Sequence, residues 1–304
     1  MQYSERSGLL LAMSGFALLS VGDAVVKSLA GHWPPLPVAA LRFTIGAVGL
    51  AVVLWKIEGS QALKPAQPWL QIGRGLCVSV ASVCFFSAVY IMPLAETMAI
   101  AFLAPVFTAL LSGPLLGEKV KPQVWLASAL AMIGVVIILR PNLALLGLPA
   151  LLPLVSAFFF GLMIVLNRKA AGQGSVVAMQ FYMAGVAAVM LTTLAAGALL
   201  TGIDAAHFDL PTWGVVARCA LIAMTATGAH WLVFLGTTRA GASQVAPCTY
   251  VQMLVATGLG WWWFGDVPDL LTIVGATIII GAGLYLWRST RDSGKNLEPD
   301  TRLG

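Results

Sequence analysis

The chain has 304 residues, of which 59% are hydrophobic and only 10% are charged, and its mean hydropathy is +0.91. Soluble domains contain about 25% charged residues, so this composition excludes a water-soluble globular protein. The net charge of +5 does not indicate nucleic-acid binding, because no soluble domain is present to carry a basic patch. The basic excess instead belongs to membrane topology.

Ten apolar segments, each long enough to span a bilayer, follow one another along the chain. They occupy residues 8–30, 36–55, 70–91, 94–116, 122–140, 149–167, 176–200, 212–236, 240–264 and 269–287. The longest breaks between them, 56–69 and 201–211, are too short to be domains. We therefore predict an all-α membrane protein with ten transmembrane helices and no extramembrane catalytic domain.

The first apolar segment, residues 8–30, is interpreted as a retained helix and not as a signal peptide. It exceeds a signal-peptide core of about 7–15 residues, and it contains Asp23 and Lys27. The four cysteines lie in apolar segments without a CxxC pair, and His32 and His207 are distant in sequence. These patterns predict no metal site and no cofactor.

Lysine and arginine are unequally distributed between alternate loops. The termini and the loops on their side of the membrane carry twelve, whereas the opposite loops carry only Arg140. Because positively charged loops are retained in the cytoplasm, we predict that both termini are cytoplasmic. The expected location is the bacterial inner (plasma) membrane, with the lipid bilayer as a partner.

An internal repeat divides the chain into two halves of five helices each. Residues 93–118 align with residues 241–266 at a constant offset of 148, and both stretches end in glycine followed by an acid. Weaker matches relate 27–31 to 168–172 and 40–43 to 179–182. Because five is odd, the second half enters the membrane from the opposite side, which predicts an inverted-topology repeat. The expected divisions are 1–148, 149–288 and a cytoplasmic tail at 289–304.

Several short motifs occur together along the chain. They are Leu41-Arg42-Phe43, Pro93-Leu94-Ala95-Glu96, Pro105 with Leu116-Gly117-Glu118, Ala246-Pro247 with Tyr250 and Gln252, Phe264-Gly265-Asp266 with Pro268-Asp269, and Gly281-Ala282-Gly283-Leu284-Tyr285. In this combination the sequence resembles the EamA-type, ten-helix members of the drug/metabolite transporter (DMT) superfamily, over nearly its whole length.

The resemblance implies a secondary transporter of a small organic metabolite. It implies a central cavity lined by the first four helices and the sixth to ninth, with the fifth and tenth peripheral and able to support a homodimer. Similar proteins include exporters of amino acids and metallophores, and importers of vitamins and S-adenosylmethionine. One departure is that Met253 stands where the first half has Pro105, so the two halves need not bend alike.

Four charged residues of the first half lie within predicted helices: Asp23, Lys27, Arg42 and Glu96. Placing a charged side chain at the bilayer centre costs about 2.5–3.5 kcal/mol, so each of these residues is expected to have a functional or structural role. Asp23 and Lys27 are four residues apart with the acid first, which favours an ion pair. The predicted topology places all four in the outer half of the membrane, where they can form a mixed-charge cluster.

Two interpretations of this cluster remain open. In the first, Arg42 binds a carboxylate and Glu96 or Asp23 binds an amine of a zwitterionic substrate. In the second, the charges neutralise one another and hold the first, second and fourth helices together. The repeat matches Arg42 with Gln180 and Glu96 with Gln244, so only the first half carries the charges. This asymmetry favours the substrate interpretation.

The second half offers aromatic and amide side chains that can line a pocket for a small molecule. The candidates are Gln180, Tyr182, His230, Trp231, Gln244, Tyr250 and Gln252. For Trp231 and Tyr250 the alternative is packing or a headgroup-level belt, and for His230 it is a hydrogen-bonded interior residue. Pro105 and Pro247 interrupt their helices and are candidates for bending or gating. Arg74, Arg140 and Arg218 are expected to extend toward the headgroups.

These features favour a transporter that works by alternating access, most simply an exporter (efflux) of amino acids or related zwitterionic metabolites. The alternative substrate class is a vitamin, a nucleoside-like metabolite or S-adenosylmethionine, taken up by an importer. A lipid flippase or an integral membrane enzyme is the alternative of another class, although HExxH and GxSxG motifs are absent from the sequence. Without an ATP-binding motif, coupling to protons or facilitated diffusion remains, and Glu96, Asp23 and His230 are the titratable candidates.

Overall fold

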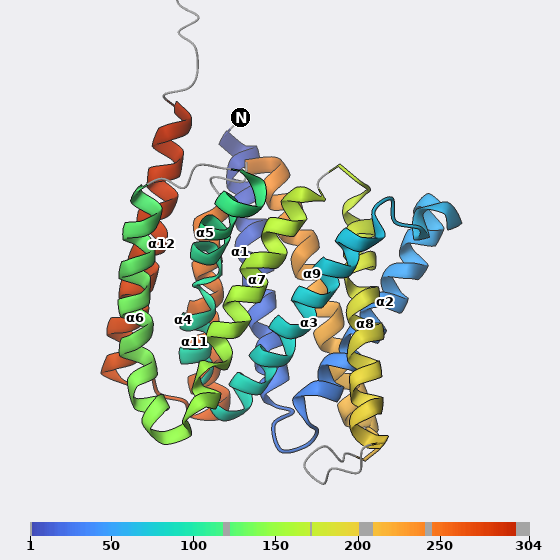
Figure 1. Ribbon diagram of the computed structural model, residues 1–304, viewed down its shortest axis with the longest axis horizontal. Coiled ribbons are helices and arrows are strands. Elements are labelled where there is room, and N and C mark those ends of the chain that lie inside the picture. The colour runs from blue at the N-terminus through green and yellow to red at the C-terminus, as the bar shows by residue number, and fades with distance from the viewer. Residues whose placement is uncertain (1, 118–121, 171, 201–208, 241–244, 296–304) are drawn as a thin grey trace, which may run out of the picture.

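The fold is a bundle of helices that run between two ends, seen in a computed structural model (Figure 1). The structure describes residues 2–117, 122–170, 172–200, 209–240 and 245–295, and no strand occurs among them. The helices are α1 (Gln2–Lys27), α2 (Pro35–Glu58), α3 (Pro68–Ile91), α4 (Leu94–Ala101), α5 (Ala104–Leu116), α6 (Pro122–Leu146), α7 (Leu152–Lys169), α8 (Val176–Leu200), α9 (Trp213–Ala240), α11 (Tyr250–Phe264) and α12 (Leu270–Lys295). Three short 3₁₀ turns occur within these residues: η1 (Ser60–Leu63), η2 (Leu148–Leu151) and η4 (Ala246–Thr249).

Eight helical stretches within the described residues are long and apolar enough to cross a membrane. They coincide with the first eight predicted segments, and α4 together with α5 forms one of them. The ninth predicted segment contains α11, which has 15 residues, and the tenth contains the shorter apolar stretch Leu270–Tyr285 of α12. The all-helical membrane architecture is therefore confirmed.

Successive connections alternate between the two ends of the bundle. The N-terminal end of α1 and the C-terminal end of α12 lie at one end, which we call the terminal end (Figure 1). The α2–α3 and α7–α8 connections lie there too, whereas the α1–α2 and α6–α7 connections lie at the opposite end. Exposed basic residues lie within or next to the helix ends and connections at the terminal end, and those described include Arg6, Lys56, Lys64, Arg168, Lys169, Arg239 and Arg288.

Four helix pairs make the most extensive contacts: α1 with α9, α2 with α8, α6 with α12, and α3 with α7. Small residues allow the backbones to approach closely, as is usual between membrane helices. A Cβ atom at Gly15 of α1 would lie 2.8 Å from the carbonyl oxygen of Ala229 on α9. A Cβ atom at Gly134 of α6 would lie 2.7 Å from the carbonyl oxygen of Gly275 on α12. Larger side chains at these positions would force the paired helices apart.

Glycines end two helices in the same way. Gly117 after α5 has φ 73° and Gly265 after α11 has φ 71°, and both lie in the left-handed region that glycine adopts without strain. The sequence predicted both helix ends, and the structure confirms them. The fourth predicted segment is interrupted at residues 102–103, directly before α5, in which Pro105 occupies the first turn.

Candidate functional site

Four of the predicted residues lie near one another on α1, α2, α9 and α11, and we call them the central polar group: Asp23, Arg42, His230 and Gln252. The first two and Gln252 are half-buried, whereas His230 is exposed. Oδ2 of Asp23 on α1 accepts a hydrogen bond from Nε2 of Gln252 on α11, at 3.1 Å. Arg42 on α2 lies within electrostatic range of this carboxylate. His230 on α9 lies within electrostatic range of Arg42. Both halves of the sequence therefore contribute to the group.

The guanidinium of Arg42 is held between aromatic rings. Its Cζ atom is 4.3 Å from the ring centroid of Phe43 and 5.5 Å from that of Phe86. Such contacts stabilise a cation without neutralising it. Among the described residues, Arg42 has no carboxylate within ion-pair distance, and its side chain is only partly buried. A guanidinium in this setting can bind a carboxylate through two parallel hydrogen bonds.

Lys27 does not pair with Asp23, contrary to the expectation from their spacing. Its Nζ atom forms an ion pair with Asp266, in the connection after α11, and also donates to the carbonyl oxygen of Met92 at 3.1 Å. The same carboxylate oxygen of Asp266 accepts from the backbone N–H of Leu94 at 3.2 Å. Lys27 lies in the last turn of α1, where its long side chain reaches these partners beyond the helix end. We call this the Lys27–Asp266 latch.

Glu96 lies apart from the central polar group, on the side of α4 that faces α6 and α12. Its Oε2 atom accepts from Nδ2 of Asn142 on α6 at 2.6 Å, and its Oε1 atom accepts from the hydroxyl of Thr272 on α12 at 3.2 Å. Its relative exposure is 9%. The four charges therefore occupy three places, and they do not form one mixed-charge cluster. The rotation of α4 about its axis, which spacing does not reveal, separates Glu96 from Arg42.

The two candidate tyrosines also point away from the central polar group. The hydroxyl of Tyr182 donates to the carbonyl oxygens of Ala62 at 2.6 Å and Lys64 at 3.2 Å, in the α2–α3 connection. The hydroxyl of Tyr250 lies against Gly283 of α12, 2.1 Å from where a Cβ atom would stand. Both tyrosines hold neighbouring elements together, and the glycine makes room for one of them.

The remaining candidates are spread along the second half. Gln180 is half-buried on α8, and Trp231 on α9 is 51% exposed with its ring 6.5 Å from that of Phe234. Gln244 lies outside the described residues, and Pro247 lies in η4. Within the part of the chain that the structure describes, no hydrogen bond or ring contact joins Gln180 or Trp231 to Arg42.

The expectation that Arg74 extends toward the headgroups is wrong. Its side chain is only 3% exposed, and its Nε atom donates to Oδ1 of Asn167 at 2.5 Å. Its Nη1 atom donates to Gln71 and to the carbonyl oxygen of Met179, the latter at 3.1 Å. Polar partners on α3, α7 and α8 keep the guanidinium inside the bundle, because together they replace the hydration that it would find at the surface.

Sequence reasoning missed three partners: Asn142, Asp266 and Thr272. A signal existed for Asp266, since it follows the helix-ending Gly265 and the predicted topology places it at the same end as Lys27. Asn142 and Thr272 carried no comparable signal. Each is a single polar residue near a helix end, and only the packing of α4, α6 and α12 brings them to Glu96.

Replacing Glu96 with alanine is expected to destabilise the protein without weakening substrate binding. The change leaves the buried amide of Asn142 and the hydroxyl of Thr272 without their acceptor, and each unsatisfied group costs about 1–3 kcal/mol, so the total is about 2–6 kcal/mol. Thermal unfolding and ligand titration of the purified variant measure the two effects separately. A large loss of affinity in a variant of normal stability would instead assign Glu96 to the substrate site.

Comparisons with known proteins agree on one class. The family model described as the EamA-like transporter family matches this chain in two segments, residues 6–140 and 147–288. The pseudopaline exporter CntI of Pseudomonas aeruginosa is 28% identical over 291 residues, which are 94% of this chain and 98% of that protein. An S-adenosylmethionine uptake transporter of Rickettsia prowazekii is 26% identical over 278 residues, covering 90% of each chain.

A further relative matches over a shorter stretch, and a solved structure matches in fold. A riboflavin transporter of Rhizobium johnstonii is 26% identical over 231 residues, 76% of this chain and 74% of that protein. A crystal structure with 20% sequence identity superimposes with a TM-score of 0.61, covering 94% of this chain and 98% of its own. At that identity the structural match concerns the fold alone.

Proposed function

The chain belongs to the EamA-like transporter family, and from this premise we propose that it exports a zwitterionic metabolite, an amino acid or a related compound, by alternating access. It is a multi-pass membrane transporter of small metabolites, and its relatives named above are bacterial transporters, which indicates the bacterial inner membrane. The names of these relatives include both an exporter and uptake transporters, so the direction and the substrate class are our proposal.

The observation that carries the proposal is the environment of Arg42. A cation within the membrane must be compensated, and Arg42 has aromatic faces and a nearby carboxylate but no direct ion pair among the described residues. A substrate carboxylate would neutralise the guanidinium of Arg42 and accept two hydrogen bonds from it. Asp23, whose carboxylate receives one hydrogen bond from Gln252, would accept a substrate amine. The two charges together match a zwitterion better than a neutral vitamin or nucleoside.

Alternating access requires the site to open to one side at a time, and we propose that the Lys27–Asp266 latch closes the outer side. The latch joins the end of α1, the start of α4 and the connection after α11. A second contact closes the neighbouring region, since the hydroxyl of Tyr90 donates to the carbonyl oxygen of Trp33 at 3.0 Å. Opening the outer side would break these contacts, and protonation of Asp23 or His230 would couple the opening to a proton gradient.

We propose further that the bundle consists of ten helices in two inverted repeats, with both termini cytoplasmic. Equivalent contacts recur in the two halves. Ser20 on α1 donates to the carbonyl oxygen of Gln252 at 2.5 Å. In the other half, a Cβ atom at Gly161 on α7 would lie 2.9 Å from the carbonyl oxygen of Ala104. Gly161 follows Ser20 by 141 residues, and Ala104 precedes Gln252 by 148 residues. These are the offsets of the sequence repeat, so a two-fold relation explains both contacts.

Other features support the same arrangement. In the proposed repeat α1 corresponds to α7 and α3 corresponds to α9, so the pair α1–α9 corresponds to the pair α7–α3. Both pairs make extensive contacts. The family model matches in two segments that approximate the halves 1–148 and 149–288. The pair α6–α12 lies at one edge of the bundle, which is where we propose that a homodimer contact forms (Figure 1).

A direct experiment tests the direction of transport. Cells that overproduce the protein are loaded with labelled dipeptides, which are hydrolysed to amino acids inside the cell, and release into the medium is followed. Faster release of one amino-acid class than from cells without the protein is expected for an exporter. Faster uptake of amino acid added outside the cells, without faster release from loaded cells, would show import. That result would overturn the proposed direction.

A further inference from the structure

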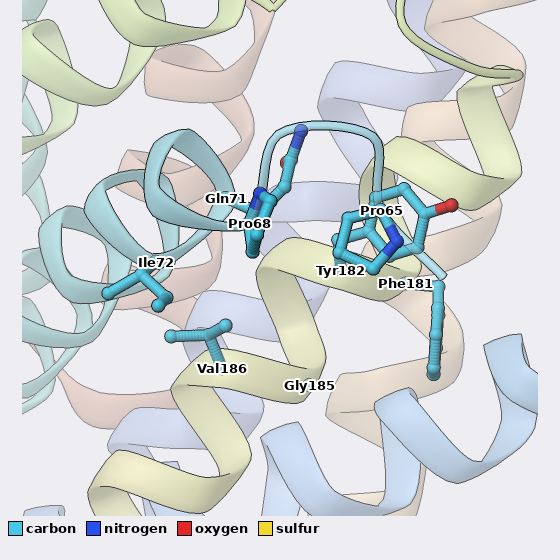
Figure 2. Close-up of a pocket in the computed structure, with 8 residues that line it drawn as sticks. All are labelled: Pro65, Pro68, Gln71, Ile72, Phe181, Tyr182, Gly185 and Val186. Atoms are coloured by element: carbon cyan, nitrogen blue, oxygen red, sulfur yellow. The ribbon is translucent and has the colours of Figure 1, made fainter. Parts of the chain in front are cut away.

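A pocket between α3 and α8 lies at the terminal end of the bundle, away from the central polar group. It has a volume of about 220 Å³ and is lined mainly by apolar side chains of the α2–α3 connection, α3 and α8. Figure 2 shows Ile72 of α3 and Val186 of α8 pointing toward each other, with Gly185 next to Val186 on the backbone of α8. Pro65 and Pro68 form its rim toward the terminal end. The pocket can therefore hold part of a hydrocarbon chain.

The surroundings of this pocket mark the depth of the lipid headgroups. Trp69, in the first turn of α3 next to Pro68, is 83% exposed, and tryptophan is enriched where a membrane meets water. Lys64 is exposed beside Pro65, and its carbonyl oxygen is fixed by the hydroxyl of Tyr182, a pocket residue, at 3.2 Å. A cation thus stands at the polar rim of an apolar pocket.

A second positive charge, that of Arg74, lies behind the inner wall of the pocket. Gln71 lines the pocket and is 2% exposed, and its amide oxygen accepts from Arg74. The amide nitrogen of Gln71 has only the sulfur of Met179, at 3.8 Å, as a partner among the described residues, and a thioether is a weak acceptor. Arg74 has no carboxylate within ion-pair distance in the described part of the chain. Gln71 therefore offers the pocket an amide donor, and the guanidinium of Arg74 lies directly behind Gln71.

We propose that this pocket is a binding site for one anionic phospholipid. Its acyl chain lies between Ile72 and Val186, and its phosphate lies at the rim, near Lys64. A lysine near a membrane surface attracts an anionic headgroup by about 1 kcal/mol. The proposal depends on membrane insertion of the bundle and not on the substrate of the transporter, so the failure of either proposal is recognised separately.

Native mass spectrometry of the detergent-purified full-length protein tests this proposal, with phosphatidylglycerol and phosphatidylcholine of the same acyl chains as probes. Wild-type protein is expected to retain one phosphatidylglycerol at concentrations where phosphatidylcholine is lost. Gly185→Leu fills the pocket, and a Cβ atom there meets no atom within 4 Å, so the variant is expected to fold and to bind phosphatidylglycerol at least tenfold more weakly.

The matched control is Gly197→Leu on the same helix, which also has open space within 4 Å and does not line the pocket. It is expected to bind as the wild type does. Lys64→Gln changes only an exposed residue of the rim and is expected to weaken phosphatidylglycerol binding about fivefold, with phosphatidylcholine unaffected. Equal binding of the two lipids by the wild type, or unchanged phosphatidylglycerol binding by Gly185→Leu, would overturn the proposal.

Discussion

Replacement of Arg42 with alanine is expected to lower substrate affinity by about 100-fold and to abolish transport at ordinary substrate concentrations. Two hydrogen bonds between a guanidinium and a carboxylate are lost, and a loss of about 3 kcal/mol corresponds to that factor. Arg42→Lys keeps the charge but not the planar pair of donors, so it is expected to retain only part of the affinity. Ligand titration of the purified variants measures both effects.

A double variant distinguishes substrate binding by Arg42 from a purely structural role. If Arg42 only compensates Asp23, then Arg42→Ala leaves an uncompensated acid, and the combination with Asp23→Asn restores both stability and transport. In the proposed mechanism the double variant regains stability but still fails to transport, because neither charge remains for a zwitterion. Transport at the wild-type rate by the double variant would remove both residues from the substrate site.

Replacement of Asp266 with asparagine is expected to open the outer side of the central polar group. The carboxylate that bonds Lys27 and the backbone of Leu94 is lost, and the pair is largely shielded, with side-chain exposures of 12% and 19%. Removing one partner of a buried ion pair costs about 3–5 kcal/mol. The cost is smaller for Lys27 and Asp266, because this pair is not fully buried. A loss of about 2 kcal/mol from the closed state would raise the population of the open state about 30-fold.

A native cysteine reports this opening. Cys219 is fully buried on α9 and lies within electrostatic range of Arg42. In a variant in which the other three cysteines are replaced by alanine, Asp266→Asn is expected to raise the labelling rate of Cys219 by a membrane-impermeant maleimide at least tenfold. Asp209→Asn, at an exposed acid near the same end, serves as the control and is expected to leave the rate unchanged. Equal rates in the two variants would mean that the latch does not close the outer side.

The sequence predicted the helices well because their signals are local. Apolar length located the membrane segments, and the glycine-acid pairs located the ends at Gly117 and Gly265. The inverted repeat that the sequence offsets predict stays a proposal, supported by the contacts of Ser20 and Gly161.

The partners of the charged residues could not be predicted in the same way. Spacing places Asp23 and Lys27 on one face of α1, but the partners of each residue come from other helices, Gln252 and Asp266. The partner of Glu96 also comes from another helix, because the rotation of α4 about its axis turns Glu96 toward Asn142 on α6. Arg74 looked like a headgroup contact because it is near a helix end, and only the packing of α3 against α7 and α8 shows that it is enclosed. Such contacts depend on non-local packing, which periodicity within one helix does not encode.

The measurement that tests the central claim most directly is thermal unfolding of the detergent-purified protein with a panel of amino acids, vitamins, nucleosides and other small zwitterions. A ligand at 100 times its dissociation constant stabilises the folded state by about 2.7 kcal/mol, which raises the midpoint detectably. We expect stabilisation by zwitterions that carry both an amine and a carboxylate, and loss of this effect in Arg42→Ala but not in Glu96→Ala. Stabilisation by a neutral vitamin or nucleoside alone, unchanged in Arg42→Ala, would contradict the proposed substrate class and site.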